Sequence, residues 1–145
     1  MNTSTQTETT LSKETIDAYS HATYIVDTYP PLEFRVDQYS EPLIRLLRIK
    51  NAKTAAWITA YNPYGKRQTP EQNKLLEDKL LQIINVKGLE YTTGRGLDSE
   101  RRAPEESLLL FNIPLNEAIE IGRLVEQNAI LWIGEDSIPR LELLL

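Results

Sequence analysis

The sequence predicts an α+β fold: a ferredoxin-like split βαβ core with a mixed sheet, plus an N-terminal helix and an extra strand–helix unit. Three continuous apolar runs, at 55–61, 107–113 and 129–133, are typical of buried strands. Helical patterns with clear start signals separate them. From Ala55 onward the expected order is therefore strand, helix, strand, strand, helix, strand, which is the order of a split βαβ repeat.

The N-terminal segment is predicted to be a disordered tail over residues 1–11. Its first ten residues contain no aliphatic side chain after Met1, so burial cannot offset the entropy of ordering them. The remaining residues, 12–145, are enough for one domain with a single core.

The first half of this domain begins with a helix over 13–22, for which Ser12 supplies a capping hydroxyl. Residues 24–26 either continue this helix or begin a strand. The alternation of apolar and polar residues over 32–36 predicts a half-buried strand. Ser40 then precedes a second helix, which Asn51 ends.

The longest helix is signalled by Thr69-Pro70-Glu71, which combines a capping hydroxyl, a proline at the first helical position and an acid in the first turn. It is expected to end near Val86, before Gly88. Its inward stripe has spacings of three and four and contains Asn73, Leu76, Leu80, Ile83 and Ile84.

The C-terminal half is predicted to contain a short strand at 89–92, a polar loop over 94–104 and the buried strand at 107–113. Asn116 is expected to cap a helix that ends near Gln127, followed by Asn128 in a left-handed conformation. A buried strand at 129–133 and an edge strand at 141–145 complete the chain.

Charge and composition exclude several functions. The net charge of −5 and a pI near 5.0 lack the basic excess of a nucleic-acid binder. The chain has no cysteine and one histidine, His21, so we expect no disulfide, metal centre or cofactor. Because it has neither a secretory signal nor an apolar run of spanning length, we expect a cytoplasmic protein without a membrane partner.

Several short motifs occur in a distinctive order. They are Thr59-Ala60-Tyr61-Asn62-Pro63, Asn73, Gly88, Glu105-Glu106-Ser107 and Gln127-Asn128-Ala129-Ile130. Together they resemble an uncharacterised bacterial family catalogued as domain of unknown function 3293. Where that family commonly has a tryptophan before the glutamate, this chain has Ala103. The resemblance implies candidate positions but no mechanism, because the family has no established activity.

The loop after the strand at 55–61 is the first candidate site. Ligands of open sheets tend to bind where strand ends meet helix N-termini, and such N-termini favour anions. We therefore expect a small anionic ligand at Tyr61, Asn62, Tyr64, Lys66 and Arg67. The alternative interpretation is a well-capped turn that binds only water.

Four further residues are candidate ligand contacts. Asn73 either orients a ligand or acts as a structural latch on the loop at 61–65, because a buried amide needs partners. Gln127 either bonds loop carbonyls or faces the same site. Arg95, on the polar loop, is a candidate anion clamp, and Ser107 lies two residues after Glu105.

These residues are compatible with three functions. The first is a binding or regulatory module for a small anionic ligand. The second is an enzyme without a metal that uses Glu105 as its general base, which requires burial of that carboxylate. The third is a protein–protein interaction module or homodimer formed through the apolar C-terminal edge at 141–145. The sequence alone does not decide between an enzyme and a binding protein.

Overall fold

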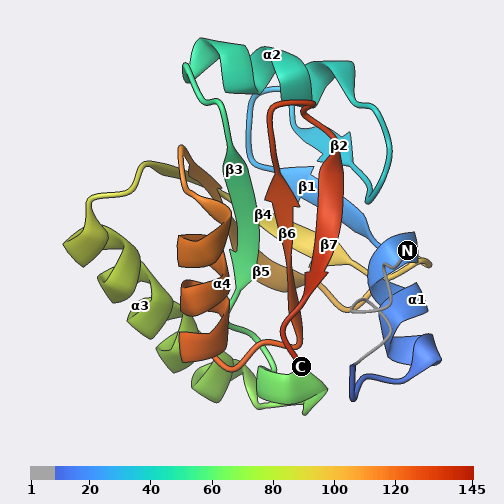
Figure 1. Cartoon of the computed structure of the whole chain (residues 1–145). Helices are drawn as coiled ribbons and strands as arrows, with labels where there is room; N and C mark the ends of the chain where they lie inside the picture. The colour runs from blue at the N-terminus through green and yellow to red at the C-terminus, as the bar shows by residue number, and fades with distance from the viewer. Residues whose placement is uncertain (1–8) are drawn as a thin grey trace.

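The structure is a computed structural model that describes residues 9–145, and it shows an α+β fold built on one seven-stranded sheet (Figure 1). The strands are β1 (Thr23–Val26), β2 (Leu32–Phe34), β3 (Ala55–Thr59), β4 (Tyr91–Leu97), β5 (Glu105–Phe111), β6 (Ala129–Ile133) and β7 (Pro139–Leu143). The helices are α1 (Lys13–His21), α2 (Glu41–Ile49), α3 (Pro70–Lys87) and α4 (Leu115–Leu124), with a 3-10 turn, η2 (Pro63–Gly65). Most of the predicted tail, residues 1–8, lies outside the described residues.

The sheet is antiparallel throughout, in the order β2-β1-β4-β5-β3-β6-β7, so the predicted mixed ferredoxin-like sheet is wrong. The predicted order of elements from Ala55 is found, but each helical crossover passes over one strand. β5 lies between β3 and β4, and β3 lies between β5 and β6. Strands joined by a helix are therefore never neighbours, and every adjacent pair runs in opposite directions.

Local signals placed most helix ends correctly. Ser12 and Ser40 cap α1 and α2, and Thr69 forms a full capping box with Gln72 at the start of α3. Gly88, at φ 69°, ends α3 in the left-handed conformation that glycine adopts without strain.

Three predictions about segments are wrong. Residues 94–96 belong to β4 and not to a loop. Asn116 does not cap α4, because Pro114 occupies the capping position without a side-chain hydrogen bond. The left-handed residue after α4 is Glu126, at φ 56°, two residues before Asn128. Residues 24–26, for which the sequence allowed either a helix or a strand, belong to strand β1.

The convex face of the curled sheet is covered by α3 and α4 (Figure 1). Apolar residues at alternate positions of β3, β5 and β6 point to this side and pack on the buried faces of the two helices. The buried members of this cluster include Ile58, Leu80, Ile84, Leu108, Leu110 and Ile121. None of the helices in residues 9–145 combines the length and apolar character that a membrane span requires.

The concave face forms a half-barrel with a second apolar core. At one end α2 closes it, and the backbone N–H of Asp37 donates to the carbonyl of Pro139 over 2.8 Å, which joins the segment after β2 to β7. At the other end lies α1, which contains no buried residue. The half-barrel is therefore tightly filled near α2 and only lightly covered near α1.

Candidate functional site

A cavity of about 220 Å³ occupies the lightly covered end of the half-barrel, between α1 and the concave face of the sheet. Its wall includes residues from α1, β1, β3, β4, β5 and β6, and most of it is apolar. The side chains that matter for its chemistry are Tyr19, Tyr24, Trp57, Thr59, Asp98, Glu105, Ser107 and Gln127. The cavity thus collects residues from both halves of the chain.

The two glycines of β4 have different surroundings, and one of them, Gly96, lines this cavity. In the register of β4 and β5, Gly96 is opposite Glu105 and Gly94 is opposite Ser107, so both glycines belong to the concave face. A Cβ on Gly94 would lie 2.6 Å from the Trp57 ring, whereas a Cβ on Gly96 would lie 3.6 Å from the ring of Tyr24. Gly94 is therefore required for packing, whereas a Cβ at Gly96 would make only an ordinary van der Waals contact with Tyr24.

Asn62 holds the Glu105 side chain in place. Its Nδ2 donates to Glu105 Oε2 over 2.7 Å, while its Oδ1 accepts from the Gln68 backbone N–H at 2.9 Å and from Asn73 Nδ2 at 3.0 Å. Asn73 Oδ1 in turn accepts from the Asn62 backbone N–H over 2.9 Å. Asn62 itself has φ 50°, a left-handed conformation that asparagine tolerates. The carboxylate is thereby anchored to the start of α3.

Burial raises the pKa of the Glu105 carboxyl, and the hydrogen bond from Asn62 opposes that rise in part. Burial also raises the pKa of the Tyr19 and Tyr24 hydroxyls, and the nearby Glu105 charge adds to both shifts. Among the described residues that line the cavity, none is Lys, Arg or His. The cavity therefore has an electronegative interior without a compensating cation.

Two other polar groups of the wall, Ser107 and Gln127, are already bonded to the backbone. Ser107 Oγ donates to the Glu105 carbonyl over 2.9 Å. Gln127 Nε2 donates to the carbonyls of Tyr61 and Val125, at 3.1 and 3.3 Å. Glu105 differs from them, since its carboxylate receives one side-chain donor, Asn62, from residues 9–145. It is the polar group with most capacity left for a ligand.

The structure divides the predicted site residues into two groups. Glu105, Ser107 and Gln127 line the cavity, and Asn62 reaches it through its bond to Glu105. Asn73 is buried and serves as the predicted latch on the loop.

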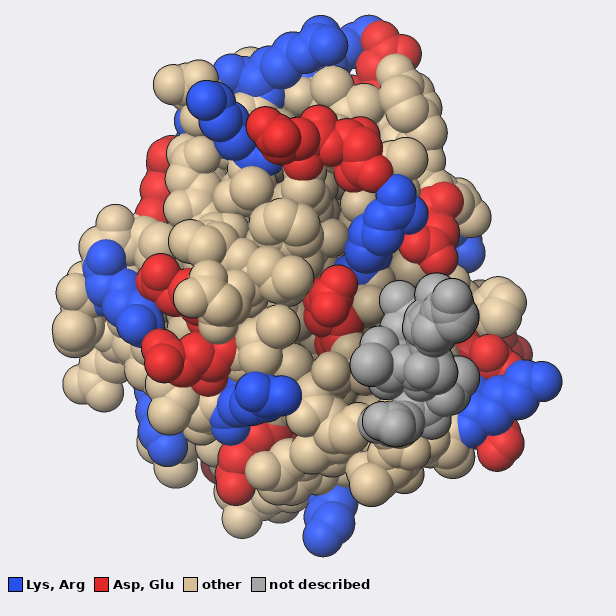
Figure 2. All heavy atoms as spheres, viewed as in Figure 1, with Lys and Arg blue, Asp and Glu red and all other residues tan. Residues whose placement is uncertain are grey.

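The remaining predicted residues do not line the cavity. Tyr61 is half-buried, and Tyr64, Lys66 and Arg67 are exposed on the loop before α3. Figure 2 shows Lys and Arg interspersed with Asp and Glu over the visible face, without a large basic patch.

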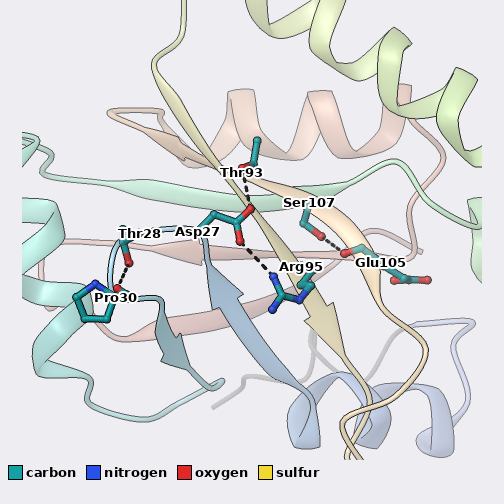
Figure 3. A network of polar contacts seen from close by, with 7 residues as sticks. All are labelled: Asp27, Thr28, Pro30, Thr93, Arg95, Glu105 and Ser107. Carbon is teal, nitrogen blue, oxygen red and sulfur yellow. Dashed lines mark hydrogen bonds and ion pairs between the residues drawn. The ribbon is translucent and has the colours of Figure 1, made fainter.

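Arg95 lies on the opposite face of the sheet because it alternates with Gly94 and Gly96 along β4. Its guanidinium is 3.2 Å from Asp27 Oδ1, and Asp27 Oδ2 also accepts from the Thr93 hydroxyl over 2.8 Å (Figure 3). The predicted anion clamp is therefore occupied by an internal ion pair and is not part of the cavity.

Sequence reasoning missed the aromatic part of the site. None of Tyr19, Tyr24 and Trp57 was among the predicted site residues, yet all three line the cavity. One local signal was available: the spacing of Gly94 and Gly96 places two residues without side chains on one face of a strand. Without the partner strands, that signal could not be connected to the tyrosines.

Residues 58–130 match the family described as "Protein of unknown function (DUF3293)". The chain belongs to this DUF3293 family. The match runs from β3 to β6 and includes Asn62, Asn73, Glu105 and Gln127, whereas α1 and β1 lie before it. No curated protein and no solved structure matches the chain. All residues of the Asn62–Glu105 hydrogen-bond network lie within the DUF3293 match. The tyrosines of the cavity wall, which α1 and β1 contribute, lie before it.

Proposed function

We propose that the protein is a small-molecule-binding module whose ligand occupies the cavity between α1 and the concave face of the sheet. The observation that supports this most strongly is the Glu105 carboxylate, fixed by Asn62 on the wall of a mainly apolar cavity. Ligand sites typically combine apolar walls with a few well-placed polar groups, as this cavity does. Its volume, about 220 Å³, is suited to a small ligand.

The expectation of an anionic ligand receives less support from this geometry. Lys66 and Arg67 do not line the cavity, and Arg95 is paired with Asp27 on the other face. An anion inside the cavity would face the Glu105 carboxylate, and like charges in a partly buried site repel each other. Anion binding at the exposed loop remains a separate prediction.

The binding proposal can be tested by NMR titration of the isotopically labelled protein with small amines, alcohols and carboxylates. A true ligand should shift the amide signals of Gly96, Glu105 and Ser107 together. Gly96→Val should remove these shifts because its side chain would project beside Glu105 into the cavity. The exposed variant Gln82→Val is the control. Binding that survives in Gly96→Val would place the ligand elsewhere.

An enzyme with Glu105 as general base is the second candidate. It is favoured by the burial that raises the pKa of this carboxyl, since a base works best when its pKa approaches the working pH. Asn62 would then be a positioning residue that fixes the orientation of Oε2.

This candidate requires proton transfer to Glu105 from a bound molecule. Carbon acids that bind in the titration would be incubated in D₂O, and exchange of their acidic hydrogens followed by NMR. Glu105→Gln should stop the exchange while leaving binding measurable. Exchange at an unchanged rate in Glu105→Gln would eliminate Glu105 as the base, and absence of exchange in the native protein for every bound carbon acid would favour binding alone.

A further inference from the structure

We infer that the ligand of the cavity is a small quaternary ammonium cation, held by the Glu105 carboxylate and the rings of Tyr19, Tyr24 and Trp57. This inference rests on the binding function proposed above and names the chemical class of the ligand. It depends on three features of the cavity: its aromatic rings, its charge and its mainly apolar wall.

Two of the aromatic rings that line the cavity pack against each other at a steep angle. The rings of Tyr24 and Trp57 have centroids 5.6 Å apart and planes inclined by 75°. Phe34 supports both, stacking on Tyr24 at 5.4 Å and meeting Trp57 edge-on at 5.4 Å. The two rings are therefore held rigidly before any ligand arrives. Tyr19, which α1 contributes to the lining, adds a third ring.

The charge around the cavity favours a cation. Aromatic faces attract cations through their quadrupole, and quaternary ammonium groups are recognised by such aromatic cages. Glu105 supplies a formal negative charge, and the described lining residues contain no basic side chain. Asp98 also belongs to the lining, but it is paired with Arg102 at 3.8 Å. A cation would therefore supply the counter-charge that the Glu105 carboxylate lacks.

The mainly apolar wall favours a methylated cation. A primary ammonium presents three donors that need acceptors. Thr59 Oγ1 already donates to the Glu106 carbonyl at 2.7 Å and accepts from the Tyr61 backbone N–H at 3.1 Å. Ser107 Oγ and Gln127 Nε2 donate to backbone carbonyls, so the acceptors left on the wall are their oxygens and the Glu105 carboxylate. A methylated nitrogen needs no such partners and places its methyl groups against the apolar remainder of the wall.

The test uses three probes of nearly equal shape on the full chain: choline, the neutral 3,3-dimethylbutan-1-ol and the anionic 3,3-dimethylbutanoate. We expect choline to bind about tenfold more tightly than the neutral alcohol, as the cation–ring and carboxylate interactions are lost when carbon replaces nitrogen. The anion should bind more weakly than either. Affinities would be measured by NMR titration at pH 7.

Two variants on α1 separate the ring from its hydroxyl. Tyr19→Phe keeps the ring and should keep the affinity for choline, whereas Tyr19→Leu should weaken it severalfold. Tyr19 is half-buried on a helix without buried residues, so both variants are expected to fold. Glu105→Gln should bring the affinities for choline and the neutral alcohol close together, with circular dichroism confirming its fold.

The outcomes distinguish the inference from the function on which it rests. The inference that the ligand is a cation would be wrong if choline and the neutral alcohol bound the native protein equally, or if the anion bound more tightly. The cavity would then still be a binding site. If none of the three probes shifts the Gly96, Glu105 and Ser107 signals but other small molecules do, the cation is again rejected. If no probe of any class does so, the binding function itself fails.

Discussion

Asn62 Nδ2 lies 2.7 Å from Glu105 Oε2, and this contact connects the loop after β3 to the first residue of β5. The same Asn62 exchanges two hydrogen bonds with Asn73, which is buried on α3. The orientation of the cavity carboxylate is therefore determined by a helix that does not line the cavity. Substitutions on α3 should change the site from a distance.

Removing the Asn73 amide should destabilise the protein. Asn73→Ala leaves the Asn62 backbone N–H without its acceptor and Asn62 Oδ1 with one donor fewer. An unsatisfied buried polar group costs about 1–3 kcal/mol, so the free energy of unfolding should fall by about that amount. Urea denaturation measures this, with Gln82→Ala on the exposed face of α3 as the control. Equal effects of the two substitutions would show that the latch contributes nothing.

The two β4 glycines should respond differently to alanine. A Cβ at Gly94 would lie 2.3 Å from the Ile25 carbonyl oxygen and 2.6 Å from Trp57, so Gly94→Ala should destabilise the fold by about 1–3 kcal/mol or more. At Gly96 the nearest atom is 3.6 Å away, so Gly96→Ala should have a much smaller effect. Thermal unfolding of both variants tests this. A greater loss in Gly96→Ala would contradict the packing described here.

The pH dependence of stability should change in Glu105→Gln. The pKa of Glu105 is raised above its usual 4.5 in the fold, so between that value and the raised one the folded state binds more protons than the unfolded chain. This group's contribution to the free energy of unfolding therefore falls as pH rises through the window and stays low above it. The difference in the free energy of unfolding between Glu105→Gln and the native protein should therefore favour the variant more at pH 7 than at pH 4.

The comparison must be made as a difference between variant and native protein. Burial raises the pKa of Glu106 and Glu142 in the same direction, and both groups contribute to the native curve. Urea denaturation at pH 4 and pH 7 gives the difference, and Glu135→Gln, at an exposed position, is the control. A gain that is the same at both pH values would disprove the effect of Glu105 burial.

Helix α1 should exchange its amide hydrogens fastest of the four helices. It has no buried residue, whereas α2, α3 and α4 each bury three. Segments with little buried apolar surface open locally at low free energy. Hydrogen–deuterium exchange measured by mass spectrometry should show this, and choline should slow exchange in α1 if Tyr19 contacts it. Protection of α1 equal to that of α3 would contradict the prediction.

The features that the sequence predicted best are those determined by residues close together in the chain. Ser12, Ser40 and Thr69 cap their helices as expected, because a capping hydroxyl bonds to a backbone N–H only a few residues away. Of the two interpretations of Asn73, the latch is the one that matches its hydrogen bond to the Asn62 backbone N–H, because Asn62 lies in the adjoining loop.

Features that depend on distant strands were missed. Gly94-Arg95-Gly96 has weak intrinsic strand preference, but β1 and β5 pair with it on both sides and make it a strand. Arg95 consequently faces Asp27. The aromatic wall escaped prediction for a similar reason: Tyr24 reaches Trp57 only because the sheet curls.

The bond between the Asp37 N–H and the Pro139 carbonyl also bears on aggregation. By strand order β2 and β7 are the two edges of the sheet, and unpaired edges recruit strands from other molecules. Here the curl joins the segment after β2 to β7, Arg140 adds an ion pair to Asp37 at 3.4 Å, and Pro139 has no N–H to offer an incoming strand. The curvature that opens the cavity at one end thus brings the two edges of the sheet together at the other, where part of each edge is no longer available to an incoming strand.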